Sequence, residues 1–185
     1  MTHDPHGQGE RVIIPADLLR AYEATDYRVY AAAGRIVLNV GRLLDEPDAL
    51  PNFTRLAIIT ANNPFSAVLE DAENAARQAA LVDAVARAGL IWFPAVGVDA
   101  RGEWPPEPSL AILDPMDPQL DEWMEVFGQN AVVVADRGTT ISLRLHPRSA
   151  ISSSAAGPCS HGQEGPAIEG HLTALVVQSR NGCSA

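Results

Sequence analysis

Short apolar runs along the chain predict the strands of a sheet. In residues 35–40, Ile36, Leu38 and Val40 fall on one face of an extended segment, because side chains alternate between the two faces of a strand. Residues 56–60 are apolar almost throughout, which is typical of a strand buried on both faces. Comparable patterns predict further strands at residues 27–29, 91–95, 109–113, 131–135 and 141–145.

Two longer segments have the spacing of helices. Residues 70–88 begin with acidic side chains, which complement the positive end of a helix dipole, and Gly89 ends the segment. Residues 118–127 carry large apolar side chains at helical spacing, and a shorter helical pattern follows Pro15. Because strands do not alternate strictly with helices, we expect a single α+β domain. Its mixed, mostly antiparallel sheet would carry two main helices and a short N-terminal helix.

The composition changes near both ends of the chain. We expect a flexible leader at residues 1–12 and the α+β domain at residues 13–147. Residues 148–185 contain a run of serine, alanine, glycine and proline with scattered glycines beyond it, which predicts a disordered low-complexity tail. Within the domain, the turn residues of segment 97–108 predict a long loop.

The charge balance restricts the partners. The 185 residues include 23 acidic and 13 basic side chains, which gives a formal net charge of -10. Nucleic acids and anionic membranes attract clustered positive charge, so we expect neither as a partner. No run of about 18 apolar residues is present and the first ten residues are polar, so we expect no membrane span, no signal peptide and a cytoplasmic location.

The residue types missing from the middle of the chain exclude several kinds of chemistry. Between Arg11 and Leu145 there is no histidine, cysteine or lysine. This excludes a nucleophile activated by an imidazole base, a Schiff-base lysine and the lysine of a phosphate-binding P-loop. It also removes the usual zinc ligands. We therefore expect no metal site and no cofactor, including at the metal-capable side chains of the tail, which are Cys159, His161, His171 and Cys183.

Polar side chains follow or precede apolar elements at several places. Asn63 follows the strand at 56–60, Glu107 precedes the strand at 109–113, and Gln129 and Asn130 follow the second helix. Such positions at element ends often line ligand sites. The alternative at each is structural, because an amide before proline or after a helix can instead cap a turn.

The helix at 70–88 carries two more amides. Asn74 and Gln78 share a face with Leu81 and Val85, so both amides are directed toward the edge of the core. A buried amide without partners costs about 1–3 kcal/mol, so we expect Asn74 to bind either the backbone of the Asn63 turn or a ligand.

Charged side chains give weaker signals. Glu73 and Arg77 have the spacing of an exposed helical ion pair, which contributes about 0.2–0.5 kcal/mol. Asp99, Glu103 and Glu107 lie within nine residues and could hold Mg²⁺ or act as acid and base. Their spacing fits no metal loop, and a solvated acidic loop is the alternative.

Four phrases resemble a known family. They are Ile-Thr-Ala-Asn-Asn-Pro at 59–64, Glu-Asn-Ala-Ala-Arg-Gln at 73–78, Trp-Pro-Pro-Glu-Pro-Ser-Leu at 104–110 and Phe-Gly-Gln-Asn-Ala at 127–131. Together they resemble the bacterial domain-of-unknown-function family 3293 (DUF3293) over roughly residues 15–146. The position of Asn62 usually holds tryptophan in that family. The family name implies no reaction, substrate or active site.

Three hypotheses about function follow. The first is non-covalent binding of a polar small ligand or peptide in a cleft lined by amides and a carboxylate, namely Asn63, Asn74, Glu107, Gln129 and Asn130. The second is a hydrolase or transferase with Glu73 or Glu107 as base, Arg77 steadying an anion, and possible use of Mg²⁺. The third is a protein-interaction or regulatory module without a small-molecule site. The spatial convergence of these side chains distinguishes the hypotheses.

Overall fold

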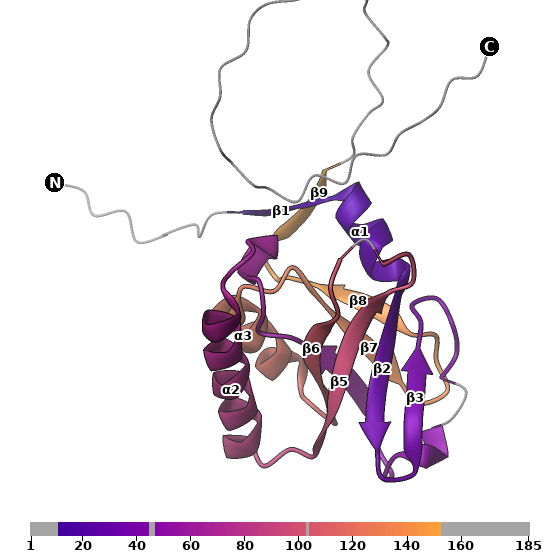
Figure 1. The fold of residues 1–185 in the computed structure, drawn as a ribbon. Helices are drawn as coiled ribbons and strands as arrows, with labels where there is room; N and C mark the ends of the chain where they lie inside the picture. The colour runs from indigo at the N-terminus through magenta and orange to yellow at the C-terminus, as the bar shows by residue number, and fades with distance from the viewer. Residues whose placement is uncertain (1–10, 45–46, 103, 153–185) are drawn as a thin grey trace, which may run out of the picture.

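The fold is described by a computed structural model, which covers residues 11–44, 47–102 and 104–152. Figure 1 shows the elements in chain order. They are β1 Val12–Pro15, α1 Ala16–Glu23, β2 Thr25–Ala31, β3 Gly34–Leu38, the 3-10 turn η1 Pro47–Ala49, β4 Arg55–Ile59, the 3-10 turn η2 Pro64–Ser66, α2 Asp71–Arg87, β5 Trp92–Asp99, β6 Glu107–Leu113, α3 Asp117–Phe127, β7 Ala131–Asp136, β8 Ser142–Leu145 and β9 Ser149–Ser152.

A curled sheet forms the centre of the molecule. Within the described part of the chain, seven strands pair in the order β3-β2-β5-β6-β4-β7-β8, and each neighbouring pair is antiparallel. Helices α2 and α3 lie together against one face of this sheet, and α1 lies at the end where β2 begins (Figure 1). The prediction of an α+β domain with a mostly antiparallel sheet, two main helices and a short N-terminal helix is confirmed.

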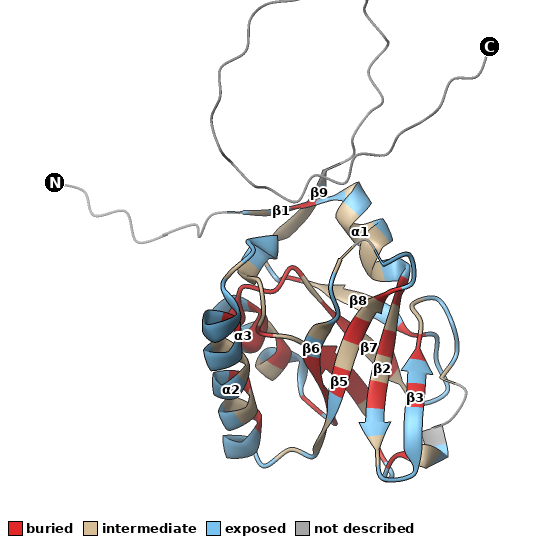
Figure 2. Ribbon diagram, viewed as in Figure 1, coloured by how far each residue is buried: buried red, intermediate tan, exposed pale blue. Residues whose placement is uncertain are grey.

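The apolar side chains form one core on each face of the sheet. On the helix-covered face, Leu81 and Val85 of α2 pack with Ile59, Leu110 and the apolar stripe of α3. The opposite face, here called the inner face, curls around a second core that includes Val29, Leu56, Ala111 and Val133. Buried residues are therefore concentrated in the central strands of the sheet (Figure 2).

The loop expected at residues 97–108 is shorter than predicted. Strand β5 continues to Asp99 and β6 begins at Glu107. The reason is pairing, because β2 extends alongside β5 until Thr25 lies opposite Asp99. Glu107 therefore lies in a strand, where its position is fixed by backbone hydrogen bonds.

A second, two-stranded sheet joins segments from near the two ends of the described chain. Strands β1 and β9 run parallel, with Val12 opposite Ser149 and Pro15 opposite Ser152. The expected tail at 148–185 is thus corrected for residues 149–152, and Val12, assigned to the leader at 1–12, is in β1. Four-residue strands that pair only with a distant segment leave little local pattern to predict them. Residues 1–10 and 153–185 lie outside the described residues.

Candidate functional site

A cavity of about 800 Å³ opens at one end of the inner face. Its floor is made by strand residues of the inner face, including Tyr27, Ile58 and Val133. The segment of β1 and α1 forms one wall, and the turn at 62–66 forms another. A hydrogen bond connects α1 to the sheet: the Tyr27 hydroxyl of β2 donates to the carbonyl of Tyr22 in α1 at 3.1 Å.

A glycine opens the space beside the carboxylate of Glu107. Gly97 of β5 lies opposite Tyr27 of β2 on one side and opposite Glu107 of β6 on the other. Side chains that are directly opposite on neighbouring antiparallel strands share one face, with Cβ atoms about 4.5–5.5 Å apart. Because Gly97 has no side chain, a gap remains between Tyr27 and Glu107, and all three residues line the cavity.

Glu107 has an unusual environment for a carboxylate. The Asn63 side chain donates from Nδ2 to Glu107 Oε1 at 3.0 Å. Among the described residues, no other donor is bonded to this carboxylate. Burial raises the pKa of Glu107 to about 7, and the hydrogen bond from Asn63 acts in the opposite direction. Glu107 is therefore close to half protonated at neutral pH.

Asn63 is held in place by Asn74. The backbone N–H of Asn63 donates to Asn74 Oδ1 at 2.9 Å, and Asn74 Nδ2 donates to Asn63 Oδ1 at 3.0 Å. Asn74 is buried and does not line the cavity. Of the two partners expected for Asn74, the structure places it against the Asn63 turn, so Asn74 positions the amide that bonds Glu107.

The amides after α3 bond the same turn from the other side. Gln129 Nε2 donates to the carbonyl of Asn62 at 2.9 Å, and Asn130 Nδ2 donates to Ser66 Oγ at 3.2 Å. Gln129 and Asn130 are both buried and both line the cavity. The four phrases of the sequence thus meet at the turn that forms one wall of the cavity.

This turn has a strained backbone. Asn63, Phe65 and Ser66 have φ values of 47°, 49° and 64°, in the left-handed region that non-glycine residues rarely adopt. The turn also packs closely on Gly128, where an added Cβ would lie 2.7 Å from the Cβ of Pro64. Strain of this kind is costly and clusters at functional sites.

Arg77 and Glu73 lie apart from the cavity. Arg77 donates from Nε to the carbonyl of Ala61 at 2.8 Å and from Nη2 to the carbonyl of Phe127 at 2.6 Å. The prediction of a solvated ion pair with Glu73 is therefore wrong. The Arg77 guanidinium turns inward instead and bonds one carbonyl that follows β4 and one at the end of α3. Glu73 is exposed on α2. Neither side chain lines the cavity.

The other predicted acidic residues do not join Glu107. Asp99 is buried, and its Oδ1 accepts the backbone N–H of Arg101 at 3.2 Å. Glu103 lies outside the described residues, as do the cysteines and histidines of the tail. Within the described ranges, no three side chains among histidine, cysteine, aspartate and glutamate are grouped to hold a metal ion.

Tyr22 and Asn62 line the cavity, although neither is among the site residues that the sequence predicts. Burial raises the pKa of Tyr22, which lies in α1, and the side chains of Asn130 and Ser66 act in the opposite direction. Asn62 also lines the cavity, and its Oδ1 is buried without a hydrogen-bond partner within the described structure. Such an orphaned acceptor is uncommon in folded proteins.

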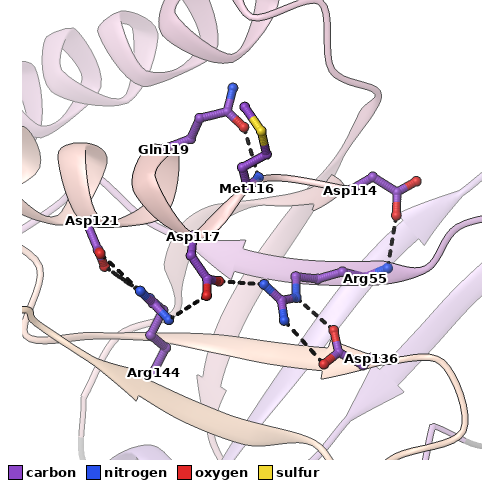
Figure 3. Close-up of polar contacts among 8 residues, drawn as sticks. All are labelled: Arg55, Asp114, Met116, Asp117, Gln119, Asp121, Asp136 and Arg144. Carbon is purple, nitrogen blue, oxygen red and sulfur yellow. Dashed lines mark hydrogen bonds and ion pairs between the residues drawn. The ribbon is translucent and has the colours of Figure 1, made fainter.

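An ion-pair network lies elsewhere, where α3 meets the strands (Figure 3). Arg55 donates from Nε to Asp136 Oδ1 at 2.7 Å and also pairs with Asp117. Arg144 extends the network by pairing with Asp117 and Asp121. The hydrogen bond from Arg55 lowers the pKa of Asp136. None of these residues lines the cavity, so the network fastens α3 to the sheet.

Comparison with known proteins supports the resemblance found in the sequence. Residues 59–132 match the model of the family described as "Protein of unknown function (DUF3293)". The match covers less than half of the chain and confirms the resemblance to this family over that segment. Searches among curated proteins and among solved structures gave no match. No helix in the described ranges is long and apolar enough to cross a membrane.

Proposed function

We propose that this chain binds a small polar ligand non-covalently in the cavity beside Glu107. The observation that carries the proposal is a largely buried carboxylate that lines a cavity of about 800 Å³ and has one hydrogen-bond donor, Asn63, within the described part of the chain. Ligand sites in proteins commonly have volumes of about 300–1,000 Å³, apolar walls and a few placed polar groups. The cavity matches this description, with aromatic rings around an amide and a carboxylate.

The energetics of Glu107 support a binding role. A buried charge without a counter-charge destabilises the fold, whereas a neutral glutamine could accept the same hydrogen bond from Asn63. The strained turn at 63–66 adds a second cost at the same place. Costs concentrated around one cavity are typical of sites kept for function rather than for stability.

A small molecule fits the cavity better than a peptide. The lining combines residues of α1, residues of the turn at 62–66 and residues of the inner face of the sheet. An extended peptide would need a longer groove or an accessible strand edge. We therefore favour a compact ligand whose polar group reaches Glu107.

The proposal is tested by screening a diverse fragment library with ligand-observed NMR. Two variants of Gly97 serve as a matched pair. An alanine Cβ would have only ordinary contacts, the nearest at 3.5 Å from Thr25 Cγ2, whereas a leucine side chain would fill the gap beside Glu107. We expect fragments that bind the wild type and Gly97→Ala but not Gly97→Leu. An absence of binding fragments, or equal binding to folded Gly97→Leu, would refute the proposal.

One observation favours a second candidate, which is general acid–base catalysis by Glu107. A group with a pKa of about 7 is suited to accept and return a proton near neutral pH. This candidate, a hydrolase or transferase, is carried by Glu107 alone, since Arg77 bonds backbone carbonyls and Glu73 is exposed. Turnover of a bound fragment that is lost in Glu107→Gln, with binding retained, would favour the enzyme.

A further inference from the structure

We propose that the ligand of this cavity carries a protonated nitrogen that pairs with the carboxylate of Glu107. The inference rests on the proposed function and specifies the chemical class of the ligand. It starts from the polar inventory of the cavity, in which the one inner carboxylate has no cationic partner among the described residues.

The two arginines that line the cavity do not neutralise Glu107. Arg148 donates from Nε to Glu125 Oε1 at 2.7 Å, and Arg11 is exposed directly before β1. Neither contributes to the pKa of Glu107, which is set by burial and by Asn63. The second carboxylate oxygen, Oε2, is therefore available to a cation that enters with the ligand.

The surrounding groups also suit a cation. The lining includes the rings of Tyr22, Tyr27, Phe65 and Trp104, and aromatic faces attract cations within about 6 Å. Trp104 already shows this behaviour, because the Arg101 guanidinium lies 6.0 Å from its ring centre. The exposed carboxylate of Asp17 adds negative charge at the rim. An anionic ligand would meet two carboxylates instead.

Binding of such a ligand is coupled to a proton. The titratable groups that face Glu107 are Tyr22 of α1 and Tyr27 of β2, and burial raises the pKa of both, so they stay neutral. A cation binds the ionised form of Glu107. Since the pKa of Glu107 is about 7, the ionised fraction and the apparent affinity rise about tenfold between pH 6 and pH 8.

The test uses matched trios that share one skeleton and differ in charge. Benzylamine, benzyl alcohol and benzoate form one trio, and 2-phenylethylamine, 2-phenylethanol and phenylacetate form another. Each compound is titrated by NMR into the wild type, Glu107→Gln and the control Glu122→Gln, which removes an exposed charge on α3. Circular dichroism checks that each variant is folded.

We expect the amines to bind the wild type and Glu122→Gln at least tenfold more tightly than the alcohols and carboxylates. This preference disappears in Glu107→Gln, and amine affinity rises about tenfold from pH 6 to pH 8. The inference is overturned if no amine binds, if the neutral or anionic member binds as tightly, or if the preference survives in Glu107→Gln. Binding of neutral or anionic compounds that Gly97→Leu blocks would leave the proposed function standing, whereas absence of binding by these compounds and by the whole fragment library would remove both.

Discussion

Replacing Glu107 with glutamine should make the protein more stable at alkaline pH and leave it unchanged at acidic pH. Glutamine keeps an oxygen for the hydrogen bond from Asn63 Nδ2, so the substitution removes the charge with little change in shape. The effect therefore isolates the cost of ionising a buried carboxyl group.

The magnitude follows from the pKa. Burial raises the pKa of Glu107 from 4.5 to about 7, and each pKa unit corresponds to about 1.4 kcal/mol. The raised value means that the folded protein holds a proton that the unfolded chain releases above pH 4.5. The stability associated with this group is complete below pH 4.5 and is lost as the pH rises through about 7, in total about 3 kcal/mol.

Urea denaturation at pH 4.5 and at pH 8.5 measures the effect as a difference between variant and wild type, which cancels the titration of other groups. We expect Glu107→Gln to unfold with nearly the wild-type free energy at pH 4.5 and to be about 3 kcal/mol more stable at pH 8.5. The control Glu122→Gln should change little at either pH. A difference for Glu107→Gln that does not grow with pH would refute the reasoning.

Three further predictions concern the turn and its supports. Gly128→Ala should lower the free energy of unfolding by about 1–3 kcal/mol more than Gly138→Ala does. Both glycines have positive φ, but only at Gly128 would the new Cβ clash, at 2.7 Å from the Cβ of Pro64. Equal losses in urea denaturation would contradict the packing described. Asn62→Leu should leave the stability unchanged or raise it, because the Oδ1 of Asn62 has no partner in the described structure. Asn74→Leu should instead lower the stability by about 1–3 kcal/mol, because it removes the acceptor of the Asn63 N–H. The reverse order in thermal unfolding would be evidence against this account. Arg77→Lys should also cost about 1–3 kcal/mol, because an ammonium group cannot span two carbonyls, and a neutral result in urea would show that these bonds contribute little.

Much of the fold could be predicted because the local patterns were strong. The alternation in 35–40 and the apolar runs at 56–60 and 131–135 correspond to β3, β4 and β7, and both main helices were found within a residue or so of their ends. The missing pair, β1 and β9, depends on two segments far apart in the chain. The order of the strands likewise depends on pairings between distant segments.

The sequence indicated which residues belong to the candidate site better than it indicated how they are arranged. The sequence pattern indicates four polar groups at element ends, and the structure brings all four to one cavity, namely Asn63, Glu107, Gln129 and Asn130. The inward turn of Arg77 could not be foreseen, because the carbonyls that it bonds belong to segments distant in sequence. The gap at Gly97 was equally hidden, since it arises only when three strands align.

The central claim is that a ligand with a protonated nitrogen occupies the cavity beside Glu107, and the side-chain amides offer a direct measurement. Addition of benzylamine to ¹⁵N-labelled protein at pH 8 should shift the side-chain amide resonances of Asn63 and Asn130, which line the cavity. The amides of Asn52 and Gln119, which lie outside the cavity lining, should not move. Unchanged resonances of Asn63 and Asn130 at saturating amine, or shifts confined to Asn52 and Gln119, would contradict the claim.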